Sequence, residues 1–152
     1  MYLLPYDGSP RLLEKTAILR AELFDDIKAS KPRSVTVFLD TCYSGATRSD
    51  EMLIAGRPIV IKANEQPIPK NFTLLTAAAG DQIANPLEEA KHGMFSYFLM
   101  KGMEGGADSN QDGKITAGEL HEYVKENVWQ QSMNKQEPQL LGDADRVLVR
   151  FQ

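Results

Sequence analysis

"SVTVFLDTCYSG", residues 34–45, is the stretch of sequence that decides the fold. Residues 35–39 are β-branched, aromatic or aliphatic, and such a run predicts a buried strand. A carboxylate (Asp40), the only cysteine of the chain (Cys42) and a small-residue turn that ends in Gly45 follow directly. The stretch therefore leaves two readings, a nucleophilic thiol at the end of a sheet strand or an inert cysteine at the edge of a core.

The composition narrows the class of protein. A chain of 152 residues is long enough for one domain with a real core. A net charge of −4 and the lack of a basic stripe argue against nucleic acid as the main partner. No apolar run approaches the roughly 18 residues of a membrane span, and no signal peptide is visible, so we expect no membrane partner and a cytoplasmic location. One cysteine excludes an internal disulfide.

The remaining sequence alternates predicted strands with predicted helices. We expect strands over residues 2–6, 35–39, 72–80 and 146–151, and helices over residues 11–28, 93–103 and 116–133. Residues 46–70 predict a long loop that contains a short edge strand, "PIVIKA". The alternation indicates an α/β fold with a mostly parallel sheet, in which ligands bind at the carboxyl ends of the strands. Cys42 follows one of these ends.

The setting of Cys42 favours chemistry over packing. A core cysteine is expected within the strand, whereas Cys42 comes after it and stands among polar residues. Ser44 and Gly45 allow a tight turn that presents backbone N–H groups to a developing oxyanion. A reactive thiolate also needs a base or a positive neighbour.

"VFLDTCYSG", residues 37–45, resembles the nucleophile strand of the caspase-like cysteine peptidases, and most of all that of the bacterial, metacaspase-type members with Asp-x-Cys-x-Ser-Gly. The segments "YLLPYD", "LLTAAAGDQIA" and "HGMFSYFLMKGM" resemble other parts of that domain, so the similarity runs from Tyr2 to about Phe151. The resemblance implies that residues 1–152 are the C-terminal larger part of one caspase-like (caspase-haemoglobinase) catalytic domain. This domain is an α/β three-layer sandwich with a mostly parallel sheet, here N-terminally incomplete.

The resemblance also implies roles for particular residues. Cys42 matches the nucleophile, and its backbone amide would contribute to the oxyanion hole. Asp40 matches the aspartate of the primary specificity pocket, which implies protein or peptide substrates cleaved after arginine or lysine. Ala79 and Asp81 belong to the substrate-side turn and are assigned to substrate binding. The alternative for Asp40 is an aspartate that only hydrogen-bonds within a turn.

The general base of the family is a histidine in a His-Gly loop, upstream of the segment that "YLLPYD" resembles. His92 is followed by glycine but lies where the resemblance places the start of a later helix, and His121 is expected on a solvated helix face. The base would then come from a missing N-terminal segment or a dimer mate, unless the chain is a remnant without activity. We therefore expect a cysteine endopeptidase in complete form, with residues 1–152 alone inactive or weakly active. The rival is a non-catalytic scaffold or calcium-responsive interaction domain.

"DSNQDGKITAGE", residues 108–119, fits the EF-hand pattern D-x-[DN]-x-[DN]-G-x₅-E. Calcium prefers oxygen ligands, and the pattern offers side-chain oxygens or, for the lysine, a backbone carbonyl. The predicted ligands are Asp108, Asn110, Asp112, Lys114, Thr116 and Glu119. The alternative is a polar turn that caps the next helix, with Thr116 and Glu119 forming a capping box.

The loop over residues 46–70 carries Arg48, Arg57, Lys62 and Lys70. In the family that the chain resembles, this region often holds a linker that is cut during activation. If Asp40 selects basic residues, self-processing in this loop is a coherent hypothesis, and an ordinary solvated loop is the simpler alternative.

Overall fold

The computed structural model describes residues 2–5, 7–40, 68–79, 86–87 and 92–151. Several predictions made from the sequence fall outside these residues. They concern Cys42, Asp81, the strand "PIVIKA" and all but the last three residues of the loop over residues 46–70. Asp40, Ala79 and the whole stretch from residue 108 to residue 119 are described.

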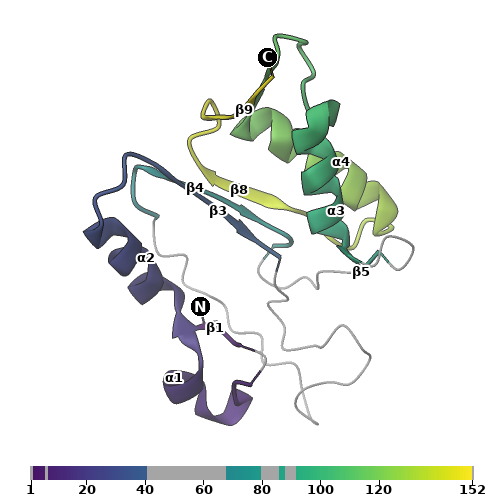
Figure 1. The fold of residues 1–152 in the computed structure, drawn as a ribbon. Helices are drawn as coiled ribbons and strands as arrows, with labels where there is room; N and C mark the ends of the chain where they lie inside the picture. The colour runs from purple at the N-terminus through teal and green to yellow at the C-terminus, as the bar shows by residue number, and fades with distance from the viewer. Residues whose placement is uncertain (1, 6, 41–67, 80–85, 88–91, 152) are drawn as a thin grey trace.

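A three-stranded sheet, in the order β3-β4-β8, lies at the centre of the described structure (Figure 1). Strands β3 (Val35–Leu39) and β4 (Phe72–Thr76) confirm two predicted strands and run parallel, with Val35 opposite Phe72 and Leu39 opposite Thr76. Strand β8 (Gln139–Gly142), which was not predicted, pairs with β4 in the antiparallel direction. One pairing of each kind does not establish the mostly parallel sheet that the sequence led us to expect.

Gly142, the last residue of β8, occupies a position that requires glycine. It lies opposite Thr73 with φ at +104°, a conformation that side chains other than hydrogen disfavour. A Cβ atom at this position would collide with the carbonyl oxygen of Phe72. The close approach of β8 to β4 at this point therefore requires glycine.

Strand β4 is buried along its whole length, and its side chains alternate between the two faces of the sheet. Leu75 packs into one hydrophobic cluster, whereas Phe72 and Leu74 pack into another. Helices lie on both sides of the sheet, with α2 (Arg20–Ala29) on one side and α3 (Met94–Lys101) and α4 (Ala117–Gln131) on the other (Figure 1). A strand buried on both faces reads as a continuous apolar run, which is why "FTLLT" is recognisable in the sequence.

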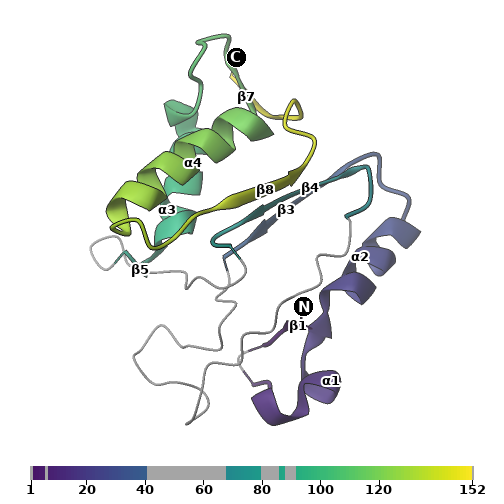
Figure 2. The ribbon, with the colours of Figure 1, turned by 180° about the vertical axis from the view of Figure 1, so that it is seen from behind.

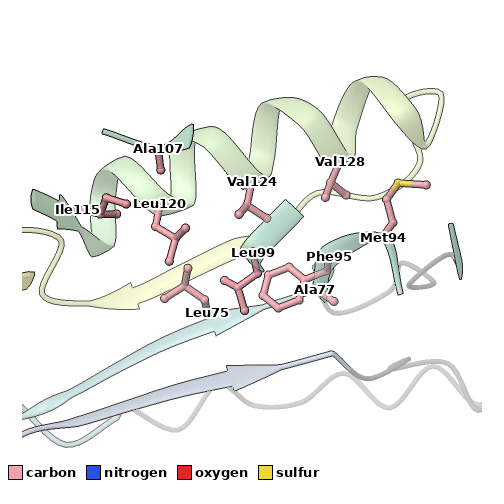
Figure 3. Close-up of a cluster of buried hydrophobic side chains, with 10 residues drawn as sticks. All are labelled: Leu75, Ala77, Met94, Phe95, Leu99, Ala107, Ile115, Leu120, Val124 and Val128. Carbon is pink, nitrogen blue, oxygen red and sulfur yellow. The ribbon is translucent and has the colours of Figure 1, made fainter. Parts of the chain in front are cut away.

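The larger cluster, called the α3–α4 core below, fills the space between the sheet and these two helices (Figure 3). Helix α4 lies along β8, as the view from behind shows (Figure 2). Apolar residues recur on α3 and α4 at helical spacing; Phe95, Leu99 and Leu120 gather near Leu75 of β4, whereas Met94 lies near Val128. The buried members of the core are Leu75, Ala77, Met94, Phe95, Leu99, Ala107, Ile115, Leu120, Val124 and Val128.

The smaller cluster, called the α2 core below, has three buried members, Phe24, Phe72 and Leu74. The rings of Phe24 and Phe72 lie 5.1 Å apart at a tilt of 48°. The guanidinium of Arg20 stands 5.7 Å from the centre of the Phe24 ring. The apolar residues around these three on α2, β3 and β8 are only partly buried.

The prediction of one helix over residues 11–28 was wrong. A short 3₁₀ turn η1 (Pro10–Leu12), helix α1 (Leu13–Thr16) and strand β2 (Ile18–Leu19) precede α2. The Thr16 hydroxyl accepts a bond from the Ser9 N–H at 2.8 Å and lies 3.0 Å from the Leu12 carbonyl, which stabilises a turn instead of a continuing helix. Strand β1 (Tyr2–Leu3), shorter than predicted, pairs with β2 in the antiparallel direction.

The C-terminal strand is confirmed as β9 (Val147–Arg150), but it does not join the central sheet. It pairs with β7 (Lys114–Thr116), within the predicted calcium loop. Helix α3 runs into a π-helical turn η3 (Gly102–Gly106) before this loop, and the short strands β5 (Pro86–Leu87) and β6 (His92–Gly93) pair with each other ahead of α3. In the part of the chain that the structure describes, no helix has the length and apolar character needed to cross a membrane.

Candidate active site

The carboxyl ends of β3 and β4 meet at one edge of the sheet, because the two strands are parallel. Asp40 follows the last residue of β3, and Ala77 follows the last residue of β4. The Ala77 N–H donates to the carbonyl of Leu39 at 2.8 Å, so the pairing continues one step past the assigned strands. Asp40 and Ala79, two of the predicted site residues, therefore emerge from the same edge, where ligands bind in sheets of this kind.

The carboxylate of Asp40 is held by a residue from a distant part of the chain. The Ser96 hydroxyl, on α3, donates to Oδ2 of Asp40 with an oxygen–oxygen distance of 2.6 Å. Hydrogen bonds from a hydroxyl to an ionised carboxylate are short and strong. Asp40 is half-buried, and this bond comes from a helix on one face of the sheet, 56 residues further along the chain.

Gln136 fixes the other strand end. Its side chain is fully buried, and Nε2 donates to the carbonyl of Ala77 at 2.8 Å. The Gln136 N–H in turn donates to the Ser132 hydroxyl at 3.0 Å, so the segment after α4 is also held. Ala77 is thereby bonded on both sides, to Leu39 through its N–H and to Gln136 through its carbonyl.

Analysis of the sequence missed both Ser96 and Gln136. Their partners are 56 and 59 residues away in the chain, a separation that no local pattern reports. Ser96 does carry a faint signal, because it is the one serine in the apolar and aromatic stretch "MFSYFLM". Gln136 lies in a polar stretch, residues 130–137, that resembles an exposed connection.

The two histidines lie in different settings. The prediction that His121 lies on a solvated face was wrong, because its side chain is only 15% exposed. Its Nε2 is 3.2 Å from the carbonyl of Pro138, toward which it donates, since the segment leading into β8 crosses this side of α4. His92 lies in β6, opposite Leu87 and directly before α3, which is where the family resemblance placed it.

The loop over residues 108–119 is organised around its acidic side chains. The carboxylate of Asp108 accepts bonds from the N–H groups of Asp112 and Gly113 at 3.2 and 3.1 Å. Asn110 accepts from Asp112 at 2.9 Å, and Asp112 accepts from the N–H of Lys114 at 2.9 Å. Gly113 has φ at +75°, which matches the sharp turn that the pattern assigns to its glycine.

The end of this loop forms the capping box that the sequence offered as an alternative. Thr116 is the N-cap of α4, its hydroxyl accepts from the Glu119 N–H at 3.2 Å, and Glu119 Oε2 accepts from the Thr116 N–H at 2.9 Å. Within the described residues, no group of three or more histidine, cysteine, aspartate or glutamate side chains is arranged to hold a metal ion. The capping box is confirmed, and the calcium site stays a prediction.

Comparison with known proteins adds one finding. A family model of the caspase domain matches residues 1–148. A search of curated proteins returned no match. The matched region takes in the edge where β3 and β4 end, the residues that hold this edge, and the sequence around Cys42.

Proposed function

The chain belongs to the caspase-domain family of peptidases, and from this membership we propose that it carries the nucleophile and the specificity carboxylate of a cysteine endopeptidase that cleaves after arginine or lysine. The observation that carries the proposal is the position of Asp40. It lies at the carboxyl end of β3, beside the turn that follows β4, with its carboxylate held by Ser96. Protein or peptide substrates follow from membership of a peptidase family.

Cys42 is the proposed nucleophile, two residues beyond Asp40 in the sequence. Its thiolate forms a bond to the scissile carbonyl carbon, and the bond to the amine breaks as the amine takes a proton. Water then hydrolyses the thioester and frees the thiol. The backbone amide of Cys42 contributes to the oxyanion hole, as the family resemblance implies.

The base that takes the thiol proton is proposed to be a histidine outside residues 1–152. The setting of His121 supports this proposal. Its Nε2 is bonded to the Pro138 carbonyl on the side of α4 next to β8, so His121 is not placed to take the proton of the thiol. A thiol without an imidazole partner loses both its activation and the acid that protonates the leaving amine. Residues 1–152 alone are therefore expected to be a poor peptidase.

Asp40 is proposed to bind the basic side chain before the scissile bond. Among the described residues, Asp40 and Ala79 flank the same strand edge, and a carboxylate there attracts a guanidinium or ammonium group and repels an acidic one. The net charge of −4 favours the approach of basic segments.

Peptide cleavage tests this function directly. Fluorogenic peptides ending in arginine, lysine or aspartate are offered to residues 1–152 alone and to the same chain joined upstream to a His-Gly segment. We expect the joined form to cleave after arginine and lysine, with activity lost in Cys42→Ala. Cleavage after aspartate, or activity that survives Cys42→Ala, would refute the proposal.

The rival function is a caspase-domain scaffold without chemistry. The rate at which iodoacetamide alkylates the single cysteine separates the two, because an activated thiolate reacts quickly near neutral pH and an inert thiol does not. In the joined form we expect fast alkylation near neutral pH that slows in acid, where the thiolate takes up a proton. Alkylation as slow as that of an ordinary thiol, together with silence on every peptide, would favour the scaffold.

Calcium binding by residues 108–119 is proposed as a second property of the chain. It is supported by the full match to the EF-hand pattern, the positive φ of Gly113 and the buried Ile115 that anchors β7 after the turn. Asp108, Asn110, Asp112, Thr116 and Glu119 would supply side-chain oxygens and Lys114 its carbonyl. Glu119 would have to exchange its bonds to Thr116 for the ion.

Glu119→Gln provides a sharp test, because glutamine can preserve the capping box but lacks the charge that calcium needs. We expect calcium to raise the unfolding temperature of the wild-type chain and of a control, Asp145→Asn, which changes an exposed acid outside the loop. Glu119→Gln should unfold normally without calcium and respond to it at least about 10-fold more weakly. Identical titrations for all three proteins would end the proposal.

Self-processing in the loop over residues 46–70 is proposed on the same specificity. Lys70 is the only one of the four basic residues that the structure describes, and it is exposed in the turn before β4. Intact mass after incubation with the active form should show cleavage after one of these residues. A chain that stays whole while peptides are cleaved would refute processing.

A further inference from the structure

The bond between Ser96 and Asp40 joins two elements that are each fixed independently. Helix α3 is anchored by Met94, Phe95 and Leu99, which are at most 7% exposed and belong to the α3–α4 core (Figure 3). Ser96 directly follows Phe95, so the packing of the helix sets the position of its hydroxyl. The N-terminal end of α3 stands beside the end of the sheet at which β3 and β4 finish (Figure 1).

The backbone on the other side of the bond is equally constrained. Leu39, directly before Asp40, accepts the Ala77 N–H at 2.8 Å, and Gln136 holds the Ala77 carbonyl at 2.8 Å. The Asp40 carboxylate thus starts from a fixed backbone and meets a fixed hydroxyl at 2.6 Å. Because both partners of the bond are held in place, the bond restricts rotation of the carboxylate and so fixes its plane.

We propose that Ser96 is a positioning residue that orients the Asp40 carboxylate so that the site selects arginine over lysine. The inference rests on the proposed function, in which Asp40 binds the basic side chain of the substrate. A guanidinium is a planar fork whose two parallel bonds require a carboxylate in one plane. An ammonium has three rotatable donors and accepts a carboxylate in many orientations.

Loss of the Ser96 hydroxyl should therefore reduce cleavage after arginine more than cleavage after lysine. Ser96→Ala removes the bond and leaves the helix intact, because alanine is the best helix former and Ser96 is only partly buried. Ser96→Thr keeps a hydroxyl at the same position and should restore selectivity. Ser30→Ala is the matched control. The Ser30 hydroxyl donates to the carbonyl of Ile27 at the end of α2, far from Asp40 in the sheet.

The first experiment measures kcat and KM on matched arginine and lysine peptides with the chain joined to its His-Gly segment. For Ser96→Ala we expect kcat/KM on arginine to fall about 10-fold, mostly through KM, and to change by less than about 3-fold on lysine. Ser96→Thr and Ser30→Ala should keep the wild-type ratio. An equal loss on both peptides would show that Ser96 acts only on the fold and would overturn the inference.

A second experiment measures binding without turnover, so that an inactive preparation still decides the question. Benzamidine, whose amidinium is a planar fork, and butylamine are titrated calorimetrically against residues 1–152. Ser96→Ala should weaken benzamidine about 10-fold and leave butylamine nearly unchanged. Unchanged benzamidine binding would overturn the inference.

Asp40→Asn separates failure of the inference from failure of the function on which it rests. If it abolishes basic preference while Ser96→Ala matches the wild type, Asp40 is the specificity residue and Ser96 does not orient it. If Asp40→Asn changes neither cleavage nor binding, or if the wild-type chain binds neither amine, the proposed specificity site falls and the inference falls with it.

Discussion

The two hydrophobic cores on either face of the central sheet differ in size among the described residues. In the described residues, the α3–α4 core has ten buried members and the α2 core has three, and partly buried apolar side chains border both. Leu75 and Leu74 are neighbours on β4 that point into these two cores, and both are essentially inaccessible to solvent. The same residue type in the same strand therefore experiences two kinds of packing.

This difference indicates which face of the sheet holds the candidate site in place. Ser96 and Gln136, which hold the edge that carries Asp40 and Ala79, both come from the side of the sheet that α3 and α4 cover. A densely packed layer can place a hydroxyl or an amide with the accuracy that a substrate pocket needs. We therefore expect the site to depend on the α3–α4 core more than on the α2 core.

Substitution of the two leucines should show the largest effect. Leu75→Ala should lower the free energy of unfolding by about 4 to 5 kcal/mol, because the surrounding core cannot collapse into the cavity. Leu74→Ala should cost about 2 to 3 kcal/mol, since its partly exposed neighbours on α2 and β3 can move inward. Urea unfolding followed by tryptophan fluorescence measures both, and equal costs would remove the distinction between the two faces.

Gln136→Leu should have the next largest effect. It leaves the buried carbonyl of Ala77 without the donor at 2.8 Å, which should cost about 1 to 3 kcal/mol. The matched control is Gln131→Leu, the same change at an exposed position at the end of α4. If both variants unfold at the same urea concentration, the bond to Ala77 contributes nothing to the free energy of unfolding.

Thr116→Ala removes the capping box at the start of α4 and should lower the free energy of unfolding by about 1 kcal/mol. The loss is expected because α4 places Leu120 and Val124 in the α3–α4 core. Thr36→Ala, in the half-buried strand β3, changes the same residue type outside a cap. A loss at position 116 no larger than that at position 36 would contradict a role for the cap.

The smallest effect concerns the ion pair between Lys125 on α4 and Glu137, with 2.8 Å between nitrogen and oxygen. The hydrogen bond that Lys125 donates to Glu137 raises the pKa of Lys125 above its ordinary value. The contribution is therefore complete below the pKa of an unfolded lysine and is lost as the pH rises through the higher folded value.

Both side chains of this pair remain partly exposed, at 41% and 34%, so screening limits the contribution to about 0.5 kcal/mol or less. Lys125→Met should be slightly less stable than the wild type at pH 8, and the difference should vanish in strongly alkaline solution. A difference that grows with pH would contradict the sign.

Local patterns in the sequence predicted most of the core elements. Strand β4 reads as an apolar run and α4 as an amphipathic helix with its cap, so both were found. Residues 11–28 carry helical periodicity, but the bonds of Thr16 to Ser9 and Leu12 and the pairing of β1 with β2 override it. Strand β8 was missed, because "QLLG" is too short to stand out.

The candidate site was predictable only in part, for a similar reason. Asp40 and Ala79 follow strands that the sequence marks clearly, and parallel pairing brings the strand ends together. Ser96 and Gln136 reach this edge from segments more than 50 residues away, through contacts that depend on how α3 and α4 pack on the sheet. Tertiary packing, not local pattern, decides such contacts.

Covalent labelling tests the central claim most directly, because the chain has a single cysteine. The chain joined to its His-Gly segment is treated with a peptide chloromethyl ketone ending in arginine and, separately, with one ending in aspartate, and the adducts are mapped by mass spectrometry. The account predicts one rapid adduct at Cys42 with the arginine reagent, slowed by an arginine substrate. Faster labelling by the aspartate reagent, or none by either at Cys42, would contradict it.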